Sequence, residues 1–172
     1  MTGIYLCPCT KETEHSIGRA LAEYAVRVIS GERHTLSHDA RGKPCFDGGW
    51  HVSISHSHGL CLAVISHRAI GADIEKTGGD PEKLLKLAAR FFAPDELAYV
   101  KESPEDRFYE IWTAKESFVK YTGEGFSRTF PSFSVFDQPL VFSHFIHGDH
   151  AVTICAESAV SAKIIEKNEW EL

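Results

Sequence analysis

Two pairs of charged residues have the types and the spacing that phosphate and metal chemistry requires. Glu116 and Lys120 lie four residues apart in the segment WTAKESFVK, so on a helix their carboxylate and ammonium share one face. Asp73 and Glu75 lie two residues apart in GADIEK, so on a strand both carboxylates point to the same face. Carboxylate oxygens suit Mg²⁺, which leaves its other positions to water and substrate phosphate. The ordinary alternatives are a solvated ion pair and two solvent-facing acids.

A long helix is predicted to position Glu116 and Lys120. Ser103 can cap it and Asp106 can complete a capping box, while Pro104 suits the first helical position. Gly123 ends it. The helix would be held by an apolar stripe at helical spacing, formed by Phe108, Ile111, Trp112, Phe118 and Val119.

Three consecutive strands are predicted to carry the other polar groups. Residues 50–55 alternate between apolar and polar side chains, which predicts a half-buried strand. Its end, Ser57-His58 before the turn at Gly59, would present a hydroxyl and an imidazole side by side. A continuous apolar strand follows at residues 60–65, and residues 71–76 form the strand of the acidic pair, with Ile74 facing the core.

The remaining pattern is a long helix followed by a small sheet, and it occurs twice. This echo predicts an α+β fold of two similar α/β lobes, each a helix packed on a small, mainly antiparallel sheet, with lobes at residues 1–66 and 67–172. Clefts between lobes are favoured ligand sites. The other predicted segments are a strand at 4–7, a helix at 17–28, a loop at 32–49, helices starting near 81 and 94, and antiparallel strands at 133–135, 140–142, 152–154 and 160–164.

Composition narrows the class of protein. The 172 residues carry a net charge of −6, which argues against broad nucleic-acid binding. No run of eighteen apolar residues occurs, and residues 1–6 lack the features of a signal peptide. The five cysteines form no Cys-x-x-Cys pair, so we expect reduced thiols and a cytoplasmic location.

The order and spacing of five motifs resemble one family. Over residues 40–136 the chain is similar to the 4′-phosphopantetheinyl transferases of the surfactin-synthetase-activating type. The Gly-x-Asp and Trp-x-x-Lys-Glu-Ser motifs together make the resemblance specific. The matching segments are Gly42-Lys43-Pro44, Ile54-Ser55-His56-Ser57, the segment from Gly71 to Lys76, Arg90-Phe91-Phe92 with Glu96, and the segment from Trp112 to Ser117 with Lys120.

The resemblance implies two lobes related by a pseudo-twofold axis, with coenzyme A in the cleft between them. The phosphopantetheine arm of coenzyme A would pass to a serine of an acyl or peptidyl carrier protein, releasing adenosine 3′,5′-bisphosphate. Carried over by position, the implied magnesium ligands are Asp73, Glu75 and Glu116. The implied coenzyme A contacts are Ser55, His56 and Lys120 at the phosphates, Lys43 on the adenine side, and Arg19 near the 3′-phosphate.

The chemistry of these residue types agrees with such a transfer. Attack on a diphosphate builds charge on phosphoryl oxygens, which a metal ion and cations stabilise. We assign Glu116 as the base that takes the serine proton, directly or through water. Lys120 would reach the same phosphate. Lys115 would lie along the apolar stripe with its ammonium at the cleft.

Two other functions remain open on the residues alone. A magnesium-dependent phosphohydrolase could use the same acids with water as the nucleophile. A non-enzymatic, histidine-rich metal- or partner-binding module would instead use histidines such as His56 with His58, or His144, His147 and His150, which we interpret as surface-loop residues. For the transferase we expect a monomer that binds neither membrane nor nucleic acid. Four aromatic residues could contact the carrier but are more typical of the core: Phe92, Tyr99, Phe126 and Phe130.

Overall fold

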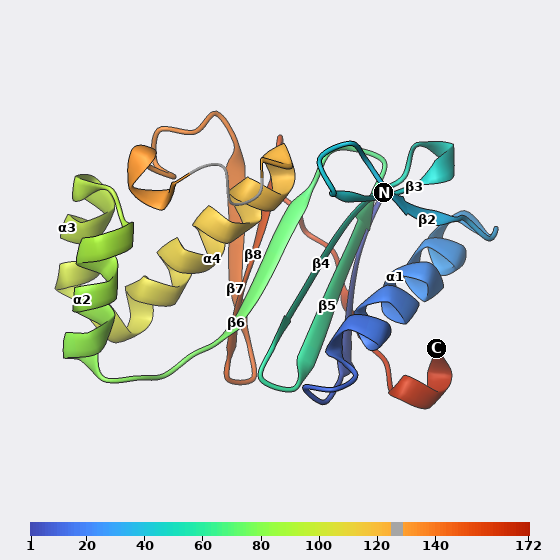
Figure 1. Cartoon of the computed structure of the whole chain (residues 1–172), viewed down its shortest axis with the longest axis horizontal. Coiled ribbons are helices and arrows are strands. Elements are labelled where there is room, and N and C mark those ends of the chain that lie inside the picture. The colour runs from blue at the N-terminus through green and yellow to red at the C-terminus, as the bar shows by residue number, and fades with distance from the viewer. Residues whose placement is uncertain (125–128) are drawn as a thin grey trace.

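Two sheets, each covered by a long helix, make up the protein (Figure 1). The computed structural model describes residues 1–124 and 129–172. A six-stranded sheet has the order β2-β3-β4-β5-β1-β9, and a three-stranded sheet has the order β6-β8-β7. The mixed architecture of two α/β lobes is the predicted one. The pseudo-twofold relation and the division of the chain at residues 66/67 stay predictions.

The first lobe is built on an antiparallel meander. Strand β5 (Leu60–Ser66) lies between β4 (His51–Ser57) and β1 (Thr2–Pro8), and helix α1 (Glu14–Ser30) packs on this sheet. The apolar stripe of α1 includes Ile17, Leu21 and Val26, all buried. Gly31 ends the helix with a φ of 80°, a left-handed conformation that favours glycine. The shorter strands are β2 (Leu36–His38), β3 (Pro44–Phe46) and β9 (Ile164–Glu166).

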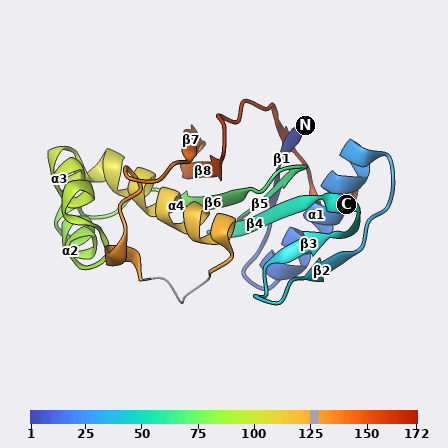
Figure 2. The same ribbon diagram turned by 90° about the horizontal axis from the view of Figure 1, so that it is seen from above.

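In the second lobe, helix α4 (Pro104–Thr122) lies across β6 (Gly71–Lys76) and β8 (His150–Ala156). Helices α2 (Pro81–Phe91) and α3 (Pro94–Glu102) pack beside α4 at the end of the molecule farthest from α1 (Figures 1 and 2). Strand β7 (Val141–His147) forms the outer edge of the sheet. Short 3₁₀ turns complete the lobe and the chain end at Phe130–Ser132 and Glu169–Glu171, and a third, Asp47–Gly49, lies in the first lobe.

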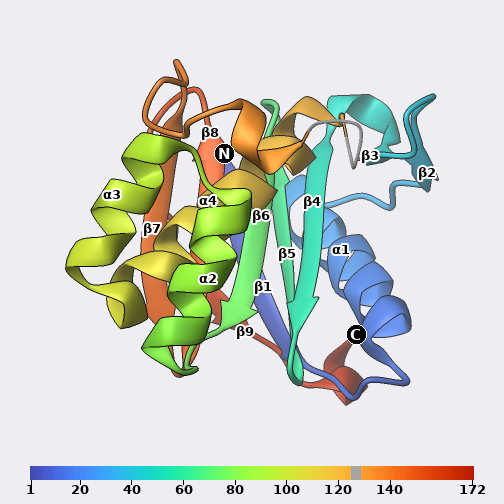
Figure 3. The same cartoon turned by 60° about the vertical axis from the view of Figure 1, so that its left-hand side comes forward.

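A row of serines joins the two sheets. Strands β4 and β6 lie next to each other in the middle of the molecule (Figure 3), but they belong to different sheets. The Ser53 hydroxyl accepts a hydrogen bond from the Ala72 amide at 2.8 Å and lies 3.3 Å from the Ala72 carbonyl oxygen. Further along, the Ser57 hydroxyl accepts from the Lys76 amide at 3.1 Å. Side-chain hydroxyls therefore replace a backbone ladder where the lobes meet.

Four local predictions were wrong. Strand β4 is not half-buried, because Ser53, Ser55 and Ser57 are covered by β6. The predicted loop at 32–49 contains β2 and β3. Residues 133–135 form no strand, although Phe133 and Val135 are buried. Strand β9 pairs parallel with β1 instead of antiparallel.

The predicted capping of α4 was also only half right. Gly123 ends the helix with a φ of 70°. At the start, the Ser103 hydroxyl donates to the Asp106 carboxylate at 2.7 Å instead of capping a backbone amide. Among the described residues, no helix is long and apolar enough to cross a membrane.

Gly71 is where α4 approaches β6 most closely, and this contact gives a stability prediction. A Cβ atom at Gly71 would lie 2.0 Å from the Ser117 carbonyl oxygen and 2.5 Å from the Tyr121 amide nitrogen, both backbone atoms of α4. Gly71→Ala should therefore push the helix off the strand and cost about 3 kcal/mol of unfolding free energy in urea denaturation.

Gly18→Ala is the matched control. Its Cβ would meet the Ile54 Cγ2 methyl group at 2.9 Å, a side-chain atom that can shift more easily than helix backbone, and a helix interior favours alanine over glycine. We expect a change within about 1 kcal/mol. Equal effects of the two substitutions would show that the contact between α4 and β6 is not the cause.

Candidate active site

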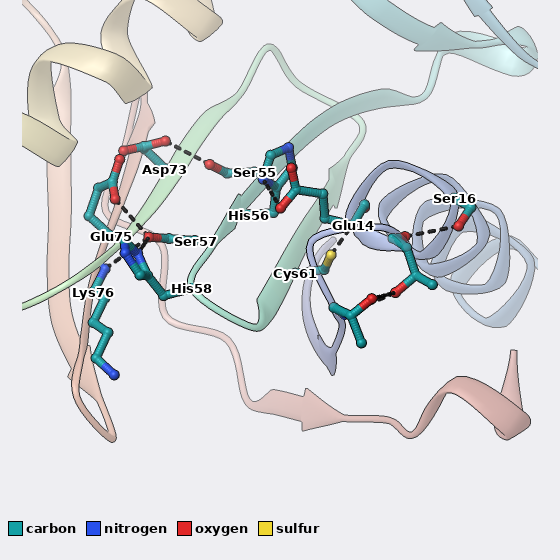
Figure 4. Close-up of polar contacts among 12 residues, drawn as sticks. Glu14, Ser16, Ser55, His56, Ser57, His58, Cys61, Asp73, Glu75 and Lys76 are labelled. Carbon is teal, nitrogen blue, oxygen red and sulfur yellow. Dashed lines mark hydrogen bonds and ion pairs between the residues drawn. The ribbon is translucent and has the colours of Figure 1, made fainter.

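The predicted acidic pair lies on the inner side of the junction between the lobes. Asp73 and Glu75 of β6 both face β4, as the alternation predicted. The Ser55 hydroxyl donates to Asp73 Oδ1 at 2.7 Å, and the Ser57 hydroxyl donates to Glu75 Oε2 at 2.7 Å (Figure 4). Each acid is thus oriented by one serine of the neighbouring strand.

Lys120 of α4 completes this arrangement from the helix side. Its Nζ lies 2.6 Å from Asp73 Oδ1 and 2.7 Å from the Ser55 hydroxyl oxygen. The Lys120 side chain is 30% exposed, whereas that of Asp73 is 5% exposed. The ammonium therefore lies at the border between the buried acid and solvent, where it can contact a bound phosphate as well as Asp73.

Glu116 lies one helical turn before Lys120, in a strongly anionic environment. Burial, followed by repulsion from Asp73, raises the pKa of Glu116 from 4.5 to about 7, although Lys120 opposes the shift. Burial also raises the pKa of Glu75, and the Asp73 charge adds to this shift while the Ser57 hydrogen bond opposes it. A carboxyl group whose pKa lies near neutrality, as that of Glu116 does, is suited to accept and release protons.

The chemistry of these acids fits a hard divalent cation. Asp73 Oδ2 is buried and has no hydrogen-bond partner, which is costly for a carboxylate oxygen unless a cation compensates. The potential metal ligands at the junction are all carboxylate oxygens, the type of ligand that Mg²⁺ prefers. The three carboxylates are not gathered to ligation distance: among the described residues, the one group of three potential ligands whose atoms all lie within 4.8 Å of one another is Glu14, His15 and His56.

His56 does not join the acidic pair. Because neighbours on a strand alternate, His56 points to the face of β4 opposite Ser55, where its Nδ1 lies 3.3 Å from Glu14 Oε2 (Figure 4). The hydroxyl and imidazole expected side by side at the end of the strand are those of Ser57 and His58, and the Ser57 hydroxyl oxygen lies 3.1 Å from His58 Nδ1. Arg19 is also on the α1 side, with its side chain 60% exposed and paired with Glu23 at 2.9 Å.

Two cavities that share part of their walls lie beside Lys120 and His56. One, of about 190 Å³, is lined by Lys43 and Lys120 among others. The other, of about 350 Å³, is lined by His56 and Arg19, and both cavities include Pro44 and Ile54 in their walls. Lys43 and Lys120 therefore line one cavity, and His56 and Arg19 line a neighbouring one that shares part of its wall.

Lys43 is held at the first cavity by the backbone of the other lobe. Its Nζ donates to the Tyr121 carbonyl oxygen at 2.7 Å and lies 3.4 Å from the Ile70 carbonyl oxygen. Burial lowers the pKa of Lys43. The lysine therefore joins the lobes as well as lining the cavity.

Lys115 corrects the sequence interpretation most clearly. Its ammonium does not reach the cleft but is fully buried, 2.8 Å from Glu96 Oε2 and 2.6 Å from the Phe133 carbonyl oxygen. Glu96 in turn accepts from the amides of Ala93 and Val135, both at 2.7 Å. This buried pair fixes α4 to the start of α3 and to the coil after α4.

Other outcomes follow from the strand positions. The serine face of β4 was visible in the sequence, but Ser57 was not recognised as the partner of Glu75 because the face was assigned to solvent.

The histidines assigned to surface loops lie in strands: His144 contacts Thr153, His147 lies near Glu166, and His150 is buried against the Ser57 carbonyl. Of the proposed carrier contacts, Phe92 is buried, and Phe126 lies outside the described residues.

Comparison with known proteins identifies the family. Residues 69–168 match the 4′-phosphopantetheinyl transferase superfamily, and residues 10–66 match the 4′-phosphopantetheinyl transferase N-terminal domain. This chain belongs to the 4′-phosphopantetheinyl transferase superfamily. The matches extend the resemblance to nearly the whole chain.

Several relatives in the 4′-phosphopantetheinyl transferase superfamily are similar over much of the sequence. The 4′-phosphopantetheinyl transferase Sfp of Bacillus subtilis is 41% identical over 128 residues, 67% of this chain and 56% of Sfp. The transferase gsp of Aneurinibacillus migulanus is 31% identical over 61% of this chain and 46% of its own length. HetI of Nostoc is 33% identical over 54% of this chain and 43% of its own length. The chain thus spans about half the length of these relatives.

The buried ion pair predicts a large stability effect. Lys115→Met leaves the Glu96 carboxylate buried without its cation and should cost about 3–5 kcal/mol of unfolding free energy. Adding Glu96→Gln removes the stranded charge and should restore part of that loss. Denaturation in urea measures both, and a Lys115→Met protein as stable as wild type would exclude the structural role.

The raised pKa of Glu116 predicts a stability that depends on pH. The folded-state pKa of about 7 exceeds the ordinary 4.5, so the folded protein binds the proton more tightly, and stability falls as pH rises from 4.5 through 7. Glu116→Gln removes this effect. The variant should be more stable than wild type above pH 7, by on the order of 1–3 kcal/mol, and the difference should vanish near pH 4.5.

Thermal unfolding across this pH range, without added metal, measures the difference. A difference between wild type and Glu116→Gln that does not change with pH would contradict the assigned pKa.

Proposed function

We propose that this chain transfers the 4′-phosphopantetheine group of coenzyme A to a serine of an apo carrier protein. The observation that carries the proposal is the environment of Asp73: one carboxylate oxygen binds Lys120 and Ser55, and the other is buried without a partner. Membership of the superfamily and the similarity to Sfp support the same reaction. The chain spans about half the length of these relatives, so their whole activity is a proposal for this chain.

The acids at the lobe junction would hold Mg²⁺. Asp73, Glu75 and Glu116 are the residues for it, and when bound the ion would neutralise the diphosphate and increase the electrophilicity of phosphorus. Glu116 would accept the proton of the attacking serine, which its pKa of about 7 allows near neutral pH. Lys120 would balance the charge that builds on the phosphoryl oxygens.

The two adjoining cavities suggest the path of coenzyme A. Lys43 and Lys120 line one cavity, and Arg19 and His56 line the other, so positive charges and a potential hydrogen-bond donor border both cavities, as a ligand with several phosphates requires. Ser55 would contact the diphosphate beside Asp73. Because Lys43 also bonds the backbone of α4, its substitution would affect both binding and lobe contact.

The proposal includes a partner and a location. The acceptor would be an acyl or peptidyl carrier protein, with no requirement for nucleic acid or membrane, and the chain would act as a monomer. A cytoplasmic location is supported by the cysteines: all five are free thiols, and three of them, Cys7, Cys61 and Cys155, are buried.

The test is intact-mass spectrometry of an apo carrier protein incubated with this chain, coenzyme A and magnesium. We expect a mass gain of one phosphopantetheine that disappears when the metal is chelated. Glu116→Gln should lower the rate by at least about 100-fold while the protein stays folded, because both the base and a ligand charge are lost. Glu166→Gln, which alters an exposed acid in β9, is the matched control and should transfer at the wild-type rate.

Two outcomes would overturn the proposal. Release of adenosine 3′,5′-bisphosphate without a mass gain on any carrier would indicate hydrolysis. Normal turnover by Glu116→Gln would remove the assigned base.

A further inference from the structure

A second group of potential ligands lies on the face of β4 opposite Asp73. Glu14 and His15 occupy the first turn of α1, and His56 projects toward them from β4. Figure 4 shows the contact between His56 and Glu14, separated from Asp73 and Glu75 by the strand. The transferase chemistry proposed above places His56 at the coenzyme A cavity but uses neither Glu14 nor His15.

The geometry of this group is close to that of a metal centre. One ligand atom from each of the three residues lies within 4.8 Å of the other two. His56 Nδ1 and Glu14 Oε2 are already 3.3 Å apart, about the separation of two ligands on a tetrahedral zinc with bonds of ~2.0–2.1 Å. The rings of His15 and His56 have centroids 5.0 Å apart and are nearly perpendicular, at 88°. The two imidazoles are therefore close to each other without stacking face to face.

The types of ligand atom in Glu14, His15 and His56 indicate which metal would bind. Two imidazoles and one carboxylate suit Zn²⁺ and similar transition metals, whereas Mg²⁺ prefers oxygen donors alone. The His56 and Glu14 side chains are 31% and 23% exposed and open on the cavity of about 350 Å³. An ion can therefore enter from solvent, and three protein ligands leave a fourth position for water.

We propose that Glu14, His15 and His56 form a zinc site, distinct from the acidic residues at the lobe junction. Zinc would bind between the Glu14 carboxylate and the two imidazoles and tie the first turn of α1 to β4. Arg19 lines the same cavity but is turned to Glu23, so its charge is partly balanced. The carboxylate of Glu14 supplies the negative charge that favours the cation.

The experiment uses the full chain, treated with a chelator and then freed of it, without coenzyme A or carrier protein. Titration with Zn²⁺ against a chromophoric chelator should give one equivalent bound. Glu14→Gln and His15→Ala should each weaken zinc binding by at least tenfold. Co²⁺ in place of zinc should give the visible spectrum of a tetrahedral site without sulfur ligands.

Two control variants separate this site from the others. Asp73→Asn removes the central acid of the lobe junction, and His147→Ala removes a histidine of β7; both should keep the wild-type zinc affinity within twofold. Unfolding midpoints verify that every variant is folded. A thiolate-to-cobalt absorption band, wild-type affinity in both Glu14→Gln and His15→Ala, or loss of binding in Asp73→Asn would overturn the proposal.

Discussion

The charge of Asp73 is the constraint on which the arrangement of the two lobes depends. A carboxylate that is 5% exposed must be compensated, and the compensating groups come from both sides of the junction, Ser55 from β4 and Lys120 from α4. The lobes therefore cannot separate or shift without leaving this charge unpaired. The same requirement places a lysine and a serine beside the unpartnered oxygen of Asp73, which makes the junction a candidate site of phosphate chemistry.

Helix α4 is held in register by two contacts of different kinds. At Gly71 the absence of a side chain allows the helix backbone to approach β6. Further from the junction, the buried pair of Lys115 and Glu96 fixes the helix to the neighbouring helix and coil. Because Glu116 follows Lys115 directly and Lys120 lies one turn later, these contacts also set the position of the two charged groups that face Asp73.

The two faces of β4 separate two kinds of chemistry. Serines on one face meet the acids of β6, and on the other face His56 meets the first turn of α1. Oxygen donors on one side and nitrogen donors on the other would select different metal ions. Burial, followed by repulsion from Asp73, raises the pKa of Glu116, and one oxygen of the buried Asp73 carboxylate has no hydrogen-bond partner.

Much of the molecule could be predicted from local pattern. Alternation placed Asp73 and Glu75 on one face, helical spacing placed Glu116 near Lys120, and the motifs indicated the family. What the sequence could not show is which faces become buried together: the serines of β4 were assigned to solvent and the Lys115 ammonium to the cleft. These depend on contacts between residues far apart in the chain. Periodicity reports how a side chain is directed from its own element, whereas only the tertiary structure decides what lies opposite.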